Sequence, residues 1–199
     1  MKPLLTVLTQ IHRPAVYVTN SRFLSSGASS GLLPLRDDAP IVGSSRELVQ
    51  RLGSQVEVRT DFITEKEEAA FLQELESGLK KKRYEFDHWD DGSQLLGPVH
   101  VIDLDKTGYI KPHIDSVKFC GSTIAGLSLL SDSIMRLVKD DSPSEWLDLL
   151  LSRRSLYILR DQARYNFTHE ILKDEESVFN GQRVPRRRRI SVICRNLPG

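Results

Sequence analysis

The sequence has few of the residues that define several common classes of protein. Cysteine occurs twice in 199 residues, at Cys120 and Cys194, and neither belongs to a Cys-x-x-Cys or Cys/His spacing. A disulfide scaffold and a zinc finger are therefore excluded, and we expect two buried thiols in a reducing compartment. No window holds the roughly 18 consecutive apolar residues of a membrane-spanning helix, so no membrane insertion is expected.

Neither sign of charge dominates the chain. It carries 28 basic and 27 acidic residues, and a formal net charge of +1 is not the strongly basic field of a dedicated nucleic-acid-binding domain. The four consecutive arginines at 186–189 invite a nucleic-acid reading, but a solvated edge that leads into a strand fits the near-neutral chain better. The length fits one domain, and we expect a monomer.

Acidic residues are missing from the N-terminal part of the chain, where the first one is Asp37. Residues 1–30 are basic and rich in Ser and Thr, which is the composition of a mitochondrial transit peptide. A disordered tail without an address is the alternative. We expect a disordered transit peptide over 1–30, a Pro/Gly/Ser-rich connector over 31–55, one domain over 56–199 and a location in the mitochondrial matrix.

The domain is predicted to be α+β and mainly β. A helix begins at Thr64, where Thr64 and Glu67 form a capping box, and its apolar residues, from Phe71 onward, are expected to lie against a sheet. Short β-type runs separated by turn residues follow at 99–104, 109–115, 122–130, 134–138, 146–151, 155–159, 163–172 and 189–195. This pattern predicts a double-stranded β-helix (jelly roll) with helical cover at its N-terminal side.

Two histidines and an aspartate form a candidate metal site. His113 and Asp115 are two residues apart in a strand and point the same way, and alternation over 163–172 carries His169 inward with its apolar neighbours. Two imidazoles and one carboxylate are the facial triad that holds non-haem Fe(II), with zinc and an activated water as the chemical competitor. Alone, His169 would be read as a hydrogen-bonded core histidine, and a second His-x-Asp pair, His88 and Asp90, is the weaker candidate because no strand alternation surrounds it.

The run RISVICR at 189–195 adds a candidate anion site. Arg189, Ser191, Ile193 and Arg195 share one face of this strand, and Ile190, Val192 and Cys194 share the other. Two arginines turned into a small barrel are costly unless each meets an anion. A dicarboxylate meets both, with its distal end on Arg189 and Ser191, and with Arg195 nearer the metal.

The segments GYIKPHID, SLYILRDQARYNFTHEIL and RRRRISVICRNLP resemble the AlkB-type Fe(II)- and 2-oxoglutarate-dependent dioxygenases, and the resemblance covers nearly all of residues 56–198. It implies that His113, Asp115 and His169 bind iron. It also implies that 2-oxoglutarate is lined by further residues, namely Arg189, Ile190, Ser191, Arg195 and Tyr157. Two departures stand out: 102–104 reads Ile-Asp-Leu where many members have Asn-x-Tyr, so that Tyr157 or Tyr109 would substitute, and the loop near 88–98 looks shortened by a few dozen residues.

The expected function is a mitochondrial dioxygenase that uses Fe(II), 2-oxoglutarate and O2 to hydroxylate or demethylate an unidentified protein, metabolite or RNA. The resemblance further implies a link to fatty-acid and energy metabolism and to regulated necrosis. The short loop leaves few aromatic residues for a lid over a flipped base, so duplex DNA is disfavoured as a partner. A catalytically impaired binding or scaffold protein and a mitochondrial tRNA demethylase are the alternatives.

Overall fold

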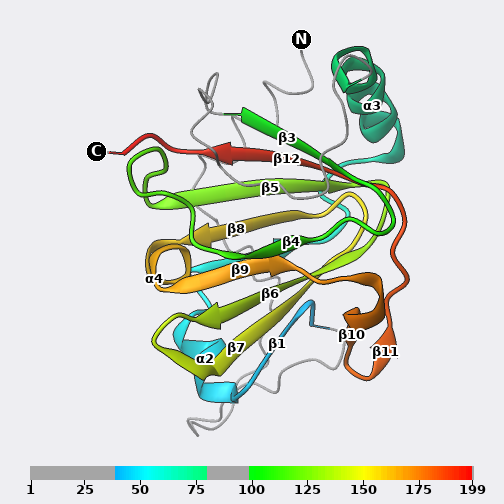
Figure 1. The fold of residues 1–199 in the computed structure, drawn as a ribbon. Helices are drawn as coiled ribbons and strands as arrows, with labels where there is room; N and C mark the ends of the chain where they lie inside the picture. The colour runs from blue at the N-terminus through cyan, green and yellow to red at the C-terminus, as the bar shows by residue number, and fades with distance from the viewer. Residues whose placement is uncertain (1–38, 80–98, 199) are drawn as a thin grey trace, which may run out of the picture. The chain divides into compact units, whose positions relative to one another are not determined.

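The apolar strands form two five-stranded antiparallel sheets in the computed structural model, which describes residues 39–79 and 99–198 (Figure 1). The β4 sheet has the order β1 (Ile41–Gly43), β7 (Ser142–Leu151), β6 (Ser133–Lys139), β9 (Phe167–Ile171) and β4 (Ile110–His113). The β5 sheet has the order β2 (Val56–Arg59), β8 (Leu156–Arg160), β5 (Thr123–Leu129), β12 (Arg189–Arg195) and β3 (Val99–Leu104). A two-stranded hairpin, β10 (Val178–Phe179) and β11 (Gln182–Arg183), and the elements α2 (Arg46–Arg51), α3 (Glu65–Leu79), α4 (Asp161–Tyr165) and η1 (Asp174–Glu176) complete the described residues.

The chain passes back and forth between the two sheets. Among the strands from β3 onward, the β5 sheet contains β3, β5, β8 and β12, and the β4 sheet contains β4, β6, β7 and β9. Apart from the β6–β7 hairpin and the separate β10–β11 hairpin, successive strands therefore lie in different sheets. Inward residues of both sheets, such as Leu137 and Leu149 from one and Ile124 and Leu159 from the other, share one core cluster. This connectivity is that of a double-stranded β-helix, and the predicted fold class is confirmed.

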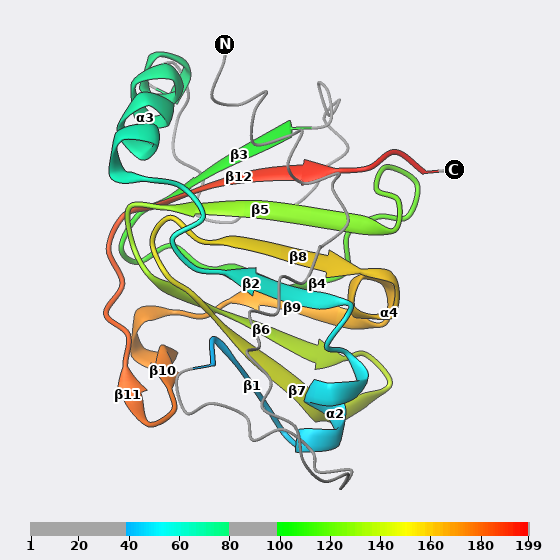
Figure 2. The same cartoon turned by 180° about the vertical axis from the view of Figure 1, so that it is seen from behind.

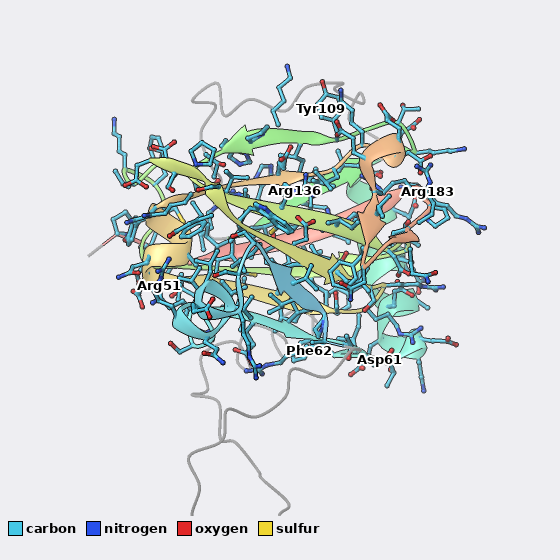
Figure 3. The ribbon with its side chains drawn as sticks, turned by 90° about the horizontal axis from the view of Figure 1, so that it is seen from below. Arg51, Asp61, Phe62, Tyr109, Arg136 and Arg183 are labelled. Atoms are coloured by element: carbon cyan, nitrogen blue, oxygen red, sulfur yellow. The ribbon has the colours of Figure 1, made fainter. Side chains whose placement is uncertain are left out.

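The outer face of the β4 sheet carries a charged pair beside apolar residues. Arg136 on β6 donates two hydrogen bonds, both of 2.8 Å, to Asp148 on β7. Figure 3 shows Arg136 toward the same side of the molecule as Tyr109, and shows Asp61 and Phe62, from the turn after β2, on the opposite side. Near the β10–β11 hairpin this outer face is covered, because Ile134 and Leu150 pack with Phe179 in a second apolar cluster.

The folded unit begins earlier than expected. β1 pairs with β7, and Leu48 and Leu52, in and after α2, are buried in the core. The compact unit accordingly starts at Pro40. The part of the expected connector that follows Ala39 therefore belongs to the folded unit. A single short strand and one helical turn are too brief to give a periodic signal, and their place was set by pairing with a distant strand.

Helix α3 begins at the capping box predicted for it. The Thr64 amide donates to Glu67 Oε2 at 2.8 Å, and the Glu67 amide donates back to Thr64 Oγ1 at 3.2 Å. The helix is attached through buried Glu68, which accepts hydrogen bonds from the Leu130 amide at 2.9 Å and from Arg153 Nε at 2.7 Å. Figure 2 shows α3 beside one end of the β5 sheet.

Glu68→Gln is expected to loosen this attachment in a pH-dependent way. Burial alone would raise the pKa of Glu68, but the bonds from Arg153 and Leu130 outweigh it and the pKa is lowered. The carboxylate therefore stabilises the fold above the unfolded-state pKa of about 4.5, and this contribution is lost as the pH falls toward the lower folded pKa. At pH 7 the free energy of unfolding in urea should fall by about 1–3 kcal/mol, and the difference should shrink below pH 4. Glu65→Gln, whose carboxylate pairs with Arg154 at the surface, is the control, and equal losses in both variants would contradict the anchoring role.

Two expectations about arginines are wrong: the strand expected over 163–172, whose alternation would turn Tyr165 inward and Arg164 outward, and the solvated edge expected at the arginine run. Residues 163–172 are not one strand, because α4 occupies Asp161–Tyr165 and β9 starts at Phe167. The change from a period of two to a helical period turns Tyr165 outward, at 40% exposure, and Arg164 inward, at 0%. In the run 186–189, Arg186 is buried and donates to the carbonyls of Leu172 and Gly108, and so this run is not a solvated edge.

No helix among the described residues has both the length and the apolar character that a bilayer crossing requires. The two cysteines are free thiols, with Cys120 buried and Cys194 half-buried. Burial raises the pKa of both thiols, that of Cys194 to about 11.

Candidate active site

A cavity of about 260 Å³ lies between the sheets and receives side chains from both. The β4 sheet and the residues that follow β4 contribute the charged and imidazole groups at one end. Strands β5, β8 and β12 of the β5 sheet contribute the opposite wall. The members of the lining that matter here are His113, Asp115, His169, Tyr157, Arg189, Ser191, Ile193 and Arg195.

His113, Asp115 and His169 meet at one end of this cavity. His113 and His169 are direct partners in the β4–β9 pairing, and their ring centroids are 4.3 Å apart. Asp115 Oδ1 lies 3.4 Å from His113 Nε2 and 4.0 Å from His169 Nε2. The three ligand atoms lie within 4.8 Å of one another, which is the spacing of donors around one metal ion.

The protonation states of the three groups suit a cation. His113 Nδ1 is 2.8 Å from the Lys111 carbonyl, which can only accept, so Nδ1 carries a proton and the neutral tautomer that fits this bond has its lone pair on Nε2. Burial, with His113 nearby, lowers the pKa of His169 to about 3, so that imidazole is neutral. Although burial alone would raise the pKa of Asp115, the adjacent His113 imidazole and the hydrogen bond from Arg195 hold it well below its usual range.

The two oxygens of Asp115 have different surroundings. Oδ2 accepts a 2.6 Å hydrogen bond from Arg195 Nε. Oδ1 is buried and has no hydrogen-bond partner within the part of the chain that the structure describes. A buried carboxylate oxygen without a donor is costly, and a cation between it and the two imidazoles removes the cost. The residues present therefore fit a divalent metal with two nitrogen ligands and one oxygen ligand.

Arg189 occupies another part of the cavity wall. It is fully buried, and its guanidinium donates to Ser128 Oγ at 3.1 Å and to Ser191 Oγ at 3.4 Å. Among the described residues, no carboxylate accepts a hydrogen bond from it in the structure, and burial lowers its pKa to about 10. A buried cation held by two hydroxyls is suited to receive a carboxylate from a ligand.

The remaining site residues expected from the sequence divide into two groups. Tyr157 lines the cavity as expected. Ile102, which stands where many AlkB-type members have asparagine, lines it as well. Ile190 lies on the opposite face of β12, and its side chain does not reach the cavity. Tyr109 lies under Lys173, 4.8 Å from its Nζ, and is not part of the cavity lining. The second His-x-Asp pair, His88 and Asp90, lies outside the described residues.

Two residues of the site were missed from the sequence. Ser128 shares a strand face with Gly126 in the run 122–130, but alternation gives only its face, and its contact with Arg189 follows from the pairing of β5 with β12. Arg164 donates from Nε to the Gly121 carbonyl and from Nη2 to the Cys120 carbonyl, both at 3.0 Å. It thereby joins the helix before His169 to the segment after Asp115. No sequence signal identified it, because α4 was read as strand.

The jelly roll, the His-Asp-His group and the buried arginine in its cavity define the class of Fe(II)- and 2-oxoglutarate-dependent dioxygenases. No family model matches the chain. Two curated relatives do: the mitochondrial alpha-ketoglutarate-dependent dioxygenase alkB homolog 7 of Bos taurus, 47% identical over 88% of this chain and 93% of its own length, and that of Mus musculus, 51% identical over 78% and 85%. The chain belongs to this alkB homolog 7 family of mitochondrial dioxygenases.

A solved structure of a Pseudomonas putida prolyl-4-hydroxylase is also similar, with 12% identity, a TM-score of 0.46 and coverage of 75% of this chain and 98% of that one. The membership confirms the expected enzyme class, its Fe(II), 2-oxoglutarate and O2, and a mitochondrial location. The bovine alignment spans 206 positions, whereas 88% of the 199 residues is about 175, so about 30 positions have no counterpart here. In the mouse alignment, about the same number of positions have no counterpart here.

Proposed function

We propose that this chain is an active dioxygenase in which His113, Asp115 and His169 hold Fe(II) and Arg189 receives the distal carboxylate of 2-oxoglutarate. The observation that carries the proposal is the buried Oδ1 of Asp115, which has no hydrogen-bond partner among the described residues and faces the imidazoles of His113 and His169. When bound, Fe(II) would supply activation of O2, of which one oxygen atom goes to the substrate C–H bond and the other to succinate, while 2-oxoglutarate loses CO2.

The residues of the chain hold the metal ligands and the Arg189 guanidinium in position and exclude water from the cavity. The Lys111 carbonyl fixes the tautomer and the ring of His113, and Arg195 holds one oxygen of Asp115 so that the other stays free for the metal. Ser128 and Ser191 orient the Arg189 guanidinium, and Tyr157 stands beside them. Arg195, bonded to Asp115, lies at the metal end, in line with the role proposed for it near the oxo-acid group.

The substrate of this enzyme is proposed only by class. It is a protein, metabolite or RNA that is hydroxylated, or demethylated where the oxidised C–H bond belongs to an N-methyl group, in the mitochondrial matrix. Duplex DNA is not part of the proposal, and the protein is proposed to act as a monomer. A link to fatty-acid and energy metabolism and to necrosis, and a role in tRNA demethylation, stay predictions.

A binding or scaffold protein with an impaired site is the second candidate. It is favoured by the roughly 30 aligned positions of the relatives that have no counterpart here, a gap of the size expected for the loop near 88–98. Loss of such a segment would leave the ligands in place and affect turnover.

The deciding measurement is succinate production from 2-oxoglutarate under Fe(II) and O2. The unsubstituted chain should turn over 2-oxoglutarate even without a substrate, and His169→Ala should reduce the rate by more than about 100-fold, since it removes a metal ligand. Thr168→Val, on the other face of β9, removes only a hydrogen bond to the Val138 carbonyl and is the control. Equal background rates in all three proteins would favour the scaffold.

A further inference from the structure

The phenol of Tyr157 lies directly over Gly126. The two residues are partners in the β5–β8 pairing, and Gly126 also pairs with Ile193 of β12 on its other side. A Cβ atom at position 126 would stand 2.3 Å from Tyr157 Cε1 and Cζ and 2.4 Å from its Oη. Only glycine leaves room for the ring, which is therefore seated against the β5 backbone and cannot move deeper.

The same phenol forms the cavity wall next to the carboxylate site proposed above. Tyr157 is buried and lines the cavity together with Ser191, one of the two hydroxyls that hold Arg189. Burial raises the pKa of Tyr157, so its hydroxyl stays neutral. The ring thus lines the same cavity as the arginine, and its position is set by the glycine behind it.

We propose that Gly126 and Tyr157 together set the chain length of the 2-oxo diacid that the cavity accepts, admitting five carbons and rejecting six. This inference rests on the proposed placement of the distal carboxylate on Arg189. With the 2-oxo end at the metal ligands and the other end on Arg189, both ends of the diacid are fixed, so an additional methylene has to bulge toward the wall. The phenol fills that wall and has the β5 backbone behind it. One methylene group in such a pocket is discriminated by about 10–200-fold.

Direct binding separates this inference from catalysis. The dissociation constants of 2-oxoglutarate and 2-oxoadipate would be measured by calorimetry on the full chain loaded with Mn(II) in place of Fe(II). The unsubstituted protein should prefer 2-oxoglutarate by at least about 10-fold. Tyr157→Leu should reduce this preference at least fivefold, whereas Tyr157→Phe, which keeps the ring, should retain it. The exposed Tyr165→Leu is the matched control and should change nothing.

Gly126→Ala tests the other partner. The added methyl should push the phenol into the cavity and weaken binding of both diacids at least about 10-fold, while Mn(II) binding without diacid changes less than threefold. In the double variant Gly126→Ala/Tyr157→Leu, 2-oxoglutarate binding should return to the level of Tyr157→Leu. An unchanged diacid preference in Tyr157→Leu overturns the proposal, and that result decides even where Gly126→Ala does not fold. Unchanged 2-oxoglutarate binding in Arg189→Met would instead overturn the proposed function on which the inference rests.

Discussion

Asp115→Asn should abolish metal binding and reduce Fe(II)-dependent turnover by more than about 100-fold, since losing even an outer partner of a metal ligand costs about 10–100-fold. The substitution replaces the carboxylate by an amide, which offers the metal either a neutral and weaker oxygen ligand or an N–H group. It also removes the charge that pairs with Arg195, whose guanidinium lies at 2.6 Å from Oδ2. The free energy of unfolding of the metal-free protein should therefore fall as well, by about 3–5 kcal/mol, because a mostly buried arginine loses its anion. Mn(II) titration, succinate release and urea unfolding measure the three effects.

Asp148→Asn is the matched control for this experiment. Asp148 is also buried and also receives an arginine, Arg136, but its oxygens face no imidazole and lie on the outer face of the β4 sheet. It should lose stability and keep both metal binding and turnover. If the two variants lost metal affinity to the same extent, the effect of Asp115 would be a general consequence of a broken ion pair.

The alternation of side chains along a strand predicted the parts of this site that lie inside regular strands. Arg189, Ser191, Ile193 and Arg195 line the cavity together, as alternation along 189–195 required. The prediction from alternation failed where the backbone is helical and not extended. Residues 161–165 form a helix, so Arg164 was placed on the wrong side, and what holds it inside is a pair of carbonyls more than 40 residues away in the chain.

The arginines at 186–189 show why adjacency in the sequence hides different roles. Arg186 binds backbone carbonyls, Arg188 pairs with Asp103 and Glu76, and Arg189 faces the cavity. Each role depends on a partner supplied by another segment, and composition averages over all of them. The arginines at 186–188 were therefore read as one solvated edge, although Arg186 is buried.

Arg189→Met should move stability and ligand binding in opposite directions. Arg189 is buried with only two serine hydroxyls as partners among the described residues, and burial lowers its pKa to about 10 because the charged form is penalised. An apolar side chain of similar length removes that penalty, so the free energy of unfolding of the ligand-free protein should stay equal or rise. Binding of 2-oxoglutarate to the Mn(II)-loaded protein should weaken by more than about 100-fold, because charge-assisted hydrogen bonds contribute about 1.5–3 kcal/mol each. The rise in Tm on adding 2-oxoglutarate should disappear with it.

Arg188→Met distinguishes the effects expected of Arg189→Met from a general effect of losing an arginine. Arg188 precedes Arg189 directly but points to the other side, where it donates to Asp103 at 2.7 and 3.0 Å and to Glu76 at 2.8 Å. Its loss should lower the free energy of unfolding, since it leaves two carboxylates without their cation, and should leave 2-oxoglutarate binding unchanged. The two variants should therefore differ in both measurements. A stability loss in Arg189→Met equal to that in Arg188→Met would mean that Arg189 already has an anionic partner in the free protein, and the cavity would then have no unmet charge for a dicarboxylate to meet.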